Sequence, residues 1–177
     1  SVALETQKTF GGTWSTHPYP GIRSDSDLHT FGYRSKPWTS APIASAPEIL
    51  KYMGEVIEEN HLAPHLRYQH TITSASWSSE ENLWTIEATR TDIGERRRFT
   101  TNFFWMCQGY YRHTEGYTPE WKDMARFKGP IVHPQKWPED LDYRNKRVIV
   151  IGSGATAATL IPAVAGDAAH VTMLQRS

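Results

Sequence analysis

A glycine-rich turn between an apolar run and a helix-forming run constrains the fold of this chain more than any other feature. Residues 148–151 are all aliphatic, Gly152-Ser-Gly154-Ala-Thr-Ala157 follows them, and a second apolar run begins near His170. The first glycine permits a tight turn, and the second lets a pyrophosphate approach the backbone at the N-terminus of a helix. The pattern predicts a strand–turn–helix–strand unit that binds a dinucleotide, with a plain strand-to-helix connection as the alternative.

The end of the second expected strand indicates which dinucleotide binds. An NAD site usually carries an acid there to hold the ribose hydroxyls, whereas this strand ends in Gln175-Arg176-Ser177. The guanidinium of Arg176 offers a forked cation to a 2′-phosphate, beside the hydroxyl of Ser177. We therefore predict NADPH rather than NADH, and an ordinary surface arginine is the alternative.

The first half of the chain alternates turns with short regular elements. Residues 1–5 are typical of the end of a buried strand that finishes in Glu5, and Gly11-Gly12 opens an irregular passage. Ser45-Ala-Pro-Glu48 is a helix start in which the Ser hydroxyl and the Glu carboxylate satisfy backbone amides reciprocally. The expected apolar stripe of this helix follows helical spacing. It consists of Ile49, Leu50, Met53, Val56 and Ile57.

Alternating apolar and polar residues predict three short strands, 71–77, 83–90 and 96–101, paired as an antiparallel meander. In the second of these, Trp84, Ile86 and Ala88 alternate with Thr85 and Glu87, so one face is expected to be buried and the other solvated. The basic run at residues 96–98 is interpreted as the solvated face of a strand. Residues 103–107 are continuously apolar, which predicts a strand covered on both faces that ends before Gly109.

Composition excludes several classes of function. The chain has 177 residues with 19 Lys and Arg against 19 Asp and Glu, so nothing favours nucleic acid or an anionic membrane as a partner. The single Cys107 excludes an intrachain disulfide and a cysteine zinc site, and it is typical of a reducing compartment. No apolar run approaches the ~18 residues that cross a bilayer. We expect a cytoplasmic protein without a transmembrane segment.

Two acids and one histidine are candidates for chemistry. Asp25 and Asp27 lie close together, but too few other oxygen ligands stand at calcium-loop spacing. An acid here is better used as the partner of a cation beside a cofactor. His133 lacks the companion ligands of a zinc motif, so we interpret it as part of the connector between two cofactor domains, with a general base as the alternative. No metal site is predicted.

An ordered array precedes the glycine turn and identifies a family resemblance. Phe127, Gly129, His133 and Trp137-Pro138 form Phe-x-Gly-x-x-x-His-x-x-x-Trp-Pro, which is referred to below as the fingerprint. Together with Gly11-Gly-Thr-Trp14 and the segment from Tyr19 to Asp27, it makes the whole chain resemble type I Baeyer–Villiger monooxygenases. Within them the chain resembles the ethionamide-activating group, in the flavin-containing monooxygenase superfamily.

The resemblance implies an α/β flavoprotein with two dinucleotide-binding domains, built of parallel doubly wound sheets with a small antiparallel meander. Residues 1–112 would belong to the FAD domain, 113–145 to a connector and 146–177 to the NADPH domain. The implied reaction uses FAD, NADPH and O₂ to insert one oxygen atom next to the carbonyl of a small ketone. Sulfur in a thioether or thioamide is a further implied target. The oligomeric state is not predicted.

The resemblance also implies a role for individual residues. On the FAD side, Glu5 would hold the ribose, the backbone of Ile72 would meet the adenine, Gly109 would close the site, and Gly12, Thr13, Trp14 and Asp25 would lie along the flavin. On the NADPH side, Gly152, Ser153, Gly154, Ala155 and Thr156 would cradle the pyrophosphate, with Arg176 and Ser177 on the 2′-phosphate. Phe127, Gly129, His133 and Trp137 would form the hinge. Asp25 is the predicted catalytic residue, because it would hold an active-site arginine.

Two departures and two alternatives accompany the resemblance. Phe31 stands where several relatives carry tyrosine, and Gln108 replaces a small hydroxyl residue. The FAD phosphate turn is expected ahead of Ser1 and the active-site arginine after Ser177, so this piece alone is expected to be inactive. One alternative is an N- or S-oxygenating flavin-containing monooxygenase. The other is a non-catalytic dinucleotide-binding module or an NADPH–flavin reductase.

Overall fold

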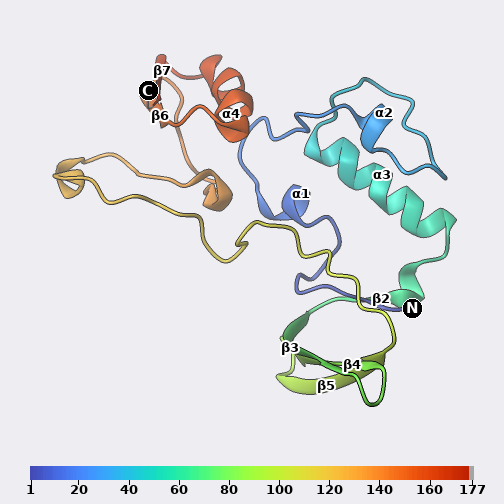
Figure 1. The fold of residues 1–177 in the computed structure, drawn as a ribbon. Helices are drawn as coiled ribbons and strands as arrows, with labels where there is room; N and C mark the ends of the chain where they lie inside the picture. Colours follow the sequence, from blue (N-terminus) through green and yellow to red (C-terminus); the bar gives the residue numbers. More distant parts are fainter. Residues whose placement is uncertain (176–177) are drawn as a thin grey trace. The chain divides into compact units, whose positions relative to one another are not determined.

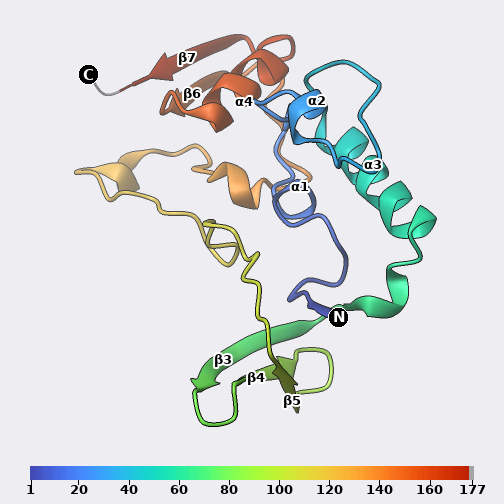
Figure 2. The ribbon, with the colours of Figure 1, turned by 45° about the vertical axis from the view of Figure 1, so that its right-hand side comes forward.

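The computed structural model describes residues 1–175 and divides into two compact units. The first unit consists of Ser1–Gly12 and Met53–Tyr111, and the second of Thr13–Tyr52 and the chain from Arg112 onward. Figures 1 and 2 show the elements of both units from two directions. The division into ligand-binding domains at residues 112 and 145 remains a prediction.

The first unit combines a short parallel pair with the predicted meander. Strand β1 (Ala3–Leu4) pairs in parallel with β2 (Leu66–Arg67), which follows the 3₁₀ turn η1 (Ala63–His65). Strands β3 (His70–Ser78), β4 (Leu83–Arg90) and β5 (Glu95–Thr101) form an antiparallel sheet in that order, seen in green in Figure 1. All three predicted strands are confirmed. A bulge between Ile72 and Ser74 shifts the register of β3 against β4.

The central strand β4 alternates as predicted at residues 86–88, whereas Trp84 and Thr85 are both half-buried. Ile86 and Ala88 are 3% and 1% exposed, whereas Glu87 between them faces solvent. The solvated character of residues 96–98 in β5 is confirmed as well, since all three arginines are exposed. Of these, Arg97 pairs with Glu95 at 2.8 Å, a surface ion pair of little energetic weight. The alternation therefore separates an apolar face of the meander from a polar one.

The expected strand at residues 103–107 is not formed. Phe103 and Trp105 are 75% and 76% exposed, and the segment has no strand geometry. A strand needs a neighbour to satisfy its backbone amides and carbonyls, and none of the described residues pairs with this segment. Apolar composition alone therefore gave a wrong prediction here. Gly109 consequently does not end a strand, although its φ of 70° lies in the left-handed region.

The helix predicted from residue 45 is α3 (Ala46–Glu59). Glu48 accepts a hydrogen bond from the Ser45 amide at 2.7 Å, which confirms its half of the predicted cap. The Ser45 hydroxyl donates to the same carboxylate at 2.6 Å. The two bonds lower the pKa of Glu48 below its ordinary value. The apolar stripe is confirmed, with Ile49 and Val56 buried.

The division between the two units falls within α3, after Tyr52. The second unit contains short helices α1 (Thr13–Thr16) and α2 (Leu28–Phe31), and 3₁₀ turns η2 (Met124–Arg126) and η3 (Pro134–Lys136). Strand β6 (Arg147–Ile151), helix α4 (Ala155–Ala165) and strand β7 (His170–Leu174) confirm the predicted strand–turn–helix–strand unit. The two strands are parallel, with Arg147 opposite His170. Figure 2 shows α4 beside this pair.

The core of the second unit lies on one face of α4. Tyr19, Leu160 and Val164 are its buried members. The partly buried side chains packed against them are Ile22, Trp137, Tyr143, Val150 and Val171. Ala157, at the position of the usual third glycine, is 6% exposed, as expected where a helix packs closely on its strand.

The burial of Ile86 predicts a large cost for its truncation. Ile86→Ala in the full-length protein should lower the free energy of unfolding by about 2 to 5 kcal/mol, because it leaves a cavity in the meander core. Ile93→Ala is the matched control: Ile93 is 60% exposed, and its truncation should cost under about 0.5 kcal/mol. Denaturant titration measures both. Equal losses at the two positions would contradict the assigned core.

Candidate functional site

The glycine turn between β6 and α4 has the geometry of an anion cradle. The Gly152 amide extends the β6–β7 ladder by donating to the Leu174 carbonyl at 2.8 Å. Gly152 has a φ of 121°, a conformation that favours glycine, and Gly154 is the N-cap of α4. The turn therefore leads the backbone directly from the end of the strand into the first turn of the helix.

The space beside Gly152 and Gly154 is open. A Cβ added at Gly152 or at Gly154 would meet no atom within 4 Å. The Gly154 cap supplies no side-chain hydrogen bond to the helix N-terminus, so the first amides of α4 keep their donor capacity for a ligand. Ser153, Ala155 and Thr156 belong to the same turn, and Ser153 and Ala155 are exposed. Arg176 and Ser177, predicted to hold the 2′-phosphate, lie outside the described residues.

Four members of the fingerprint have identifiable contacts in the second unit. The Phe127 ring folds over Gly129, where an added Cβ would lie 2.7 Å from the ring. Trp137 packs against the α4 core and meets Tyr143 edge-on, with ring centroids 5.9 Å apart. His133 accepts a hydrogen bond at Nδ1 from the Gln135 amide at 3.2 Å and so caps η3. These side chains of the fingerprint therefore make packing contacts or hydrogen bonds within the second unit.

His133 also has a contact that the sequence did not indicate. A Cβ added at Gly116 would lie 2.1 to 2.4 Å from three atoms of the His133 ring, so the ring rests directly on the Gly116 backbone. Residues 112 and 113 are tied to η3 as well. The Gln135 side chain donates to the Arg112 carbonyl at 2.6 Å, and Lys136 donates to the His113 carbonyl at 3.4 Å. No short-range pattern links these segments, which are about twenty residues apart.

The two acids singled out in the sequence have different roles. Asp27 is the N-cap of α2: it accepts from the Thr30 amide at 3.0 Å and from the Thr30 hydroxyl at 2.8 Å. These bonds lower the pKa of Asp27 below its ordinary value. Asp25 is exposed, and no hydrogen bond or ion pair occupies its carboxylate among the described residues. Of the two, Asp25 is thus the acid whose carboxylate is available to a further group.

A histidine cluster beside α1 was missed by the sequence analysis. His17 is 7% exposed, and its ring meets the ring of His113 edge-on at 5.6 Å. The His17 Nδ1 atom lies 3.1 Å from the Thr13 carbonyl, so it carries the proton and donates. The Thr16 hydroxyl lies 3.0 Å from the same nitrogen and 3.1 Å from Nδ1 of His113. Thr16 thereby bridges the two imidazoles.

Burial lowers the pKa of His17 below its ordinary value of 6.5. The hydrogen bond to the Thr13 carbonyl opposes this effect, and the charges of His113, His133 and Lys136 add to it. The neutral imidazole is therefore the favoured form in the folded protein.

The predicted FAD residues of the first unit lie at several places in it. The backbone of Glu5 continues the β1–β2 ladder through a 2.9 Å bond to the Arg67 carbonyl, and the Glu5 carboxylate accepts from the Gln7 amide at 2.8 Å. Gly12 has a φ of 50°. Ile72 precedes the bulge of β3 and is 38% exposed. Thr13 and Trp14 belong to α1 of the second unit.

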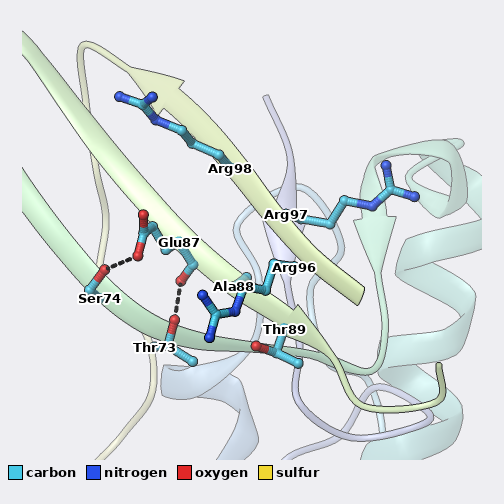
Figure 3. A pocket seen from close by; sticks show the side chains of 8 residues that line it. All are labelled: Thr73, Ser74, Glu87, Ala88, Thr89, Arg96, Arg97 and Arg98. Carbon is cyan, nitrogen blue, oxygen red and sulfur yellow. Dashed lines mark hydrogen bonds between the residues drawn. The ribbon is translucent and has the colours of Figure 1, made fainter. Parts of the chain in front are cut away.

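The polar face of the meander contains a groove of about 370 Å³, shown in Figure 3. Its floor is held by Glu87, which accepts from the Thr73 hydroxyl at its carbonyl and from the Ser74 hydroxyl at its carboxylate. The other lining residues are Ala88, Thr89, Arg96, Arg97 and Arg98. None of the residues predicted to bind a cofactor lines this groove.

Within residues 1–175, no group of three or more His, Cys, Asp or Glu side chains is arranged to hold a metal ion. In the same part of the chain, no helix is long and apolar enough to cross a membrane.

A match to a known protein family shows where the chain belongs. The family model described as flavin-binding monooxygenase-like matches residues 43–177, which is most of the chain. The chain belongs to the flavin-binding monooxygenase-like family. Membership accounts for the glycine turn and the fingerprint together, and it confirms the family resemblance drawn from the motifs.

Individual proteins are similar over 99% of the chain. The FAD-containing monooxygenase EthA of Mycolicibacterium smegmatis is 53% identical over 178 residues, which cover 99% of this chain and 36% of EthA. A steroid monooxygenase structure bound to NADP has a TM-score of 0.79 and 31% identity, covering 99% of this chain and 34% of that one. The cyclohexanone monooxygenase of Rhodococcus sp. Phi1, bound to NADP⁺, gives 0.74 and 30%, covering 99% and 33%. The chain thus spans about a third of these relatives.

These structures also confirm the expected fold class. The likeness extends over 99% of this chain, which itself contains the parallel strand pairs and the small antiparallel meander that the sequence predicted.

The lowered pKa of His17 predicts acid sensitivity with a defined sign. Because the unfolded chain binds a proton to this residue more readily than the folded one, its contribution to stability is complete above about pH 6.5 and is lost as pH falls through the folded pKa. His17→Asn keeps an N–H donor but cannot titrate. The variant of the full-length protein should therefore lose less thermal stability than the parent between about pH 8 and pH 5.

His61→Asn is the matched control, because His61 is exposed and its φ of 52° suits asparagine. Melting temperatures measured across the pH range test the prediction. If His17→Asn and the parent lose the same number of degrees on acidification, His17 is not a source of the acid sensitivity.

Proposed function

We propose that the protein of which this chain forms a part is a monooxygenase that uses FAD, NADPH and O₂ to insert an oxygen atom next to the carbonyl of a small ketone. The observation that carries the proposal is the open glycine turn at the N-terminus of α4, within a chain of the flavin-binding monooxygenase-like family. The preceding fingerprint, whose Trp137 packs against the core of the same helix, supports it.

NADPH is assigned to the second unit. Gly152 and Gly154 leave room for the pyrophosphate, and the amides from Ser153 to Thr156 provide donors at the positive end of the helix dipole. Arg176 and Ser177 follow β7 in the sequence at the point where a 2′-phosphate would need a cation. The structures of relatives bound to NADP support this choice.

FAD is assigned on the evidence of the family and of the residues that the resemblance implies. Glu5 follows β1, and its carboxylate, which accepts one backbone amide, has capacity left for ribose hydroxyls. The backbone of Ile72 is placed against the adenine, and Gly12, Thr13, Trp14 and Gly109 are assigned to the remaining cofactor surface. Relatives named FAD-containing monooxygenases support this assignment.

Residues of this chain would position the cofactors and a cation for the reaction. Bound FAD and NADPH would together supply the electrons that activate O₂. The turn at residues 152–156 would hold the NADPH pyrophosphate. Asp25 offers a free carboxylate that fixes a cation, and a cation placed beside the reacting oxygen would stabilise negative charge there. Phe127, Gly129, His133 and Trp137 order the connector between the two dinucleotide domains, which we place at residues 1–112 and 146–177.

A ketone is proposed because structures of steroid and cyclohexanone monooxygenases resemble the chain over 99% of its length. Oxygenation of a thioether or thioamide sulfur by the same machinery is included in the proposal. The single cysteine supports a reducing compartment, and we place the protein in the cytoplasm.

The open space at Gly154 predicts a selective loss of NADP⁺ binding. Gly154 has a φ of −75°, so alanine suits the backbone, but the added methyl group occupies the cradle. Gly154→Ala in the full-length protein should weaken NADP⁺ binding about 10-fold or more, the result of forfeiting ~1.4 kcal/mol or more. The melting temperature should stay close to that of the parent.

Gly166→Ala is the matched control, at the other end of the same helix. Gly166 has a φ of −70°, and a Cβ there also meets nothing within 4 Å. Calorimetric titration with NADP⁺ should give the parent's affinity for this variant. An unchanged affinity in Gly154→Ala would exclude the turn as the pyrophosphate site.

Product analysis tests the reaction itself. Full-length protein is supplied with NADPH, O₂ and either a cyclic ketone or a thioether. A lactone that carries one atom of ¹⁸O₂ is the expected product of the ketone. Sulfoxide without lactone would instead assign an N- or S-oxygenating enzyme. NADPH consumption that yields only hydrogen peroxide would assign a reductase and contradict the proposal.

A further inference from the structure

We propose that Gly21 and Tyr19 are positioning residues that fasten the segment carrying Asp25 to helix α4, so that Asp25 and the pyrophosphate turn are held as one rigid piece. The inference rests on the proposed function, since it assigns Asp25 a part in the reaction. It concerns a contact within the second unit between residues about 140 positions apart in the sequence.

Gly21 lies directly on the surface of α4. A Cβ added there would be 2.5 Å from the Cβ of Ala163 and 2.5 Å from the carbonyl oxygen of Thr159. Real Cβ atoms do not approach this closely, and the carbonyl belongs to the helix backbone, so it cannot rotate away. Gly21 also has a φ of 78°, which disfavours any side chain. Only glycine allows the segment to sit this close to the helix.

Tyr19 anchors the same segment two residues earlier. Its side chain is 8% exposed and forms the buried core with Leu160 and Val164. Its hydroxyl accepts a long hydrogen bond, 3.4 Å, from the Thr159 hydroxyl. Thr159 and Ala163 are four residues apart, as are Leu160 and Val164, so these contacted positions share one face of α4. The N-terminus of this helix carries the glycine turn.

A second set of contacts holds the segment on its far side. The Ser24 amide donates to the Ala44 carbonyl at 2.8 Å, and the Ser24 hydroxyl accepts from the Ala44 amide at 3.1 Å. The Ala46 amide donates to the Ile22 carbonyl at 3.1 Å. Ser24 is 6% exposed, whereas the next residue, Asp25, is exposed. The chain is therefore clamped from Tyr19 to Ser24, and Asp25 is the first residue beyond the clamp.

The clamp explains how Asp25 can be placed accurately without packing of its own. An exposed carboxylate on a loop is normally mobile, but Asp25 directly follows Ser24, whose amide and hydroxyl are hydrogen-bonded to Ala44. Displacing the segment from α4 would move Asp25 relative to the turn that holds the NADPH pyrophosphate. A shift of about 1 Å in a positioned group can cost about 100-fold in rate. Gly21 and Tyr19 thus act on the reaction through Asp25 rather than by touching a cofactor.

The test is a double-mutant cycle in the full-length protein, read as the stopped-flow rate of flavin reduction by saturating NADPH. Gly21→Ala and Asp25→Asn should each slow reduction about 10- to 100-fold while FAD content stays at the parent's level. Because Gly21 acts through Asp25, the double variant should be no more than about 2-fold slower than Asp25→Asn alone. A loss of fold alone would not produce this non-additivity.

Gly94→Ala is the matched control. Gly94 also has a positive φ, 70°, but a Cβ there meets nothing within 4 Å, so this variant should reduce its flavin at the parent's rate. Should Gly21→Ala fail to fold, Ala163→Val adds bulk to the same contact from the helix side and takes its place in the cycle. Ala165→Val, at an exposed position of the same helix, is its control.

The outcomes separate the two claims. Multiplicative losses in the double variant, or a parental rate in both Gly21→Ala and Ala163→Val, would overturn the positioning role while leaving the proposed function intact. A full-length protein that binds no FAD, or whose flavin NADPH does not reduce, would instead overturn the proposed function.

Discussion

The packing of Tyr19 and the segment after it against helix α4 is the contact on which the rest of the second unit depends. It brings residues near the start of the chain onto a helix near its end, and Leu160 and Val164 close the core around it. Burial of these side chains is the main favourable contribution, because each apolar side chain removed from water stabilises the fold by about 1.5 to 3 kcal/mol. Backbone hydrogen bonds from Ser24 to Ala44 and from Ala46 to Ile22 then hold the segment that follows Tyr19 in place.

Glycine serves a different physical purpose at each step of the site. At Gly152 it provides a backbone conformation, and at Gly154 it leaves space for a ligand. At Gly21 and Gly116 it allows close approach, to a helix carbonyl in one case and to the His133 ring in the other. The motifs of this chain are therefore rich in glycine for reasons of packing as much as of flexibility. A substitution at each position has a distinct expected consequence.

Local patterns predicted most of the elements, and long-range contacts account for what they missed. The three meander strands, helix α3 and the β6–α4–β7 unit follow from periodicity and turn chemistry within a dozen residues. The strand predicted at residues 103–107 does not form, because a strand depends on a partner as well as on its own composition. The bridge from His17 to His113 and the seat of His133 on Gly116 join distant segments, so no local pattern reports them. Asp25 was singled out from its chemistry and from the family resemblance, and its catalytic role stays a prediction.

Amide hydrogen exchange on the full-length protein, with and without NADP⁺, tests most directly whether α4 unites the glycine turn with the Asp25 segment. A ligand that stabilises one cooperative unit slows opening throughout that unit. We expect NADP⁺ to slow exchange at residues 152–157 and at residues 21–25 together, while β4 keeps its own rate. Slowed exchange at the turn alone, with residues 21–25 unaffected, would contradict it.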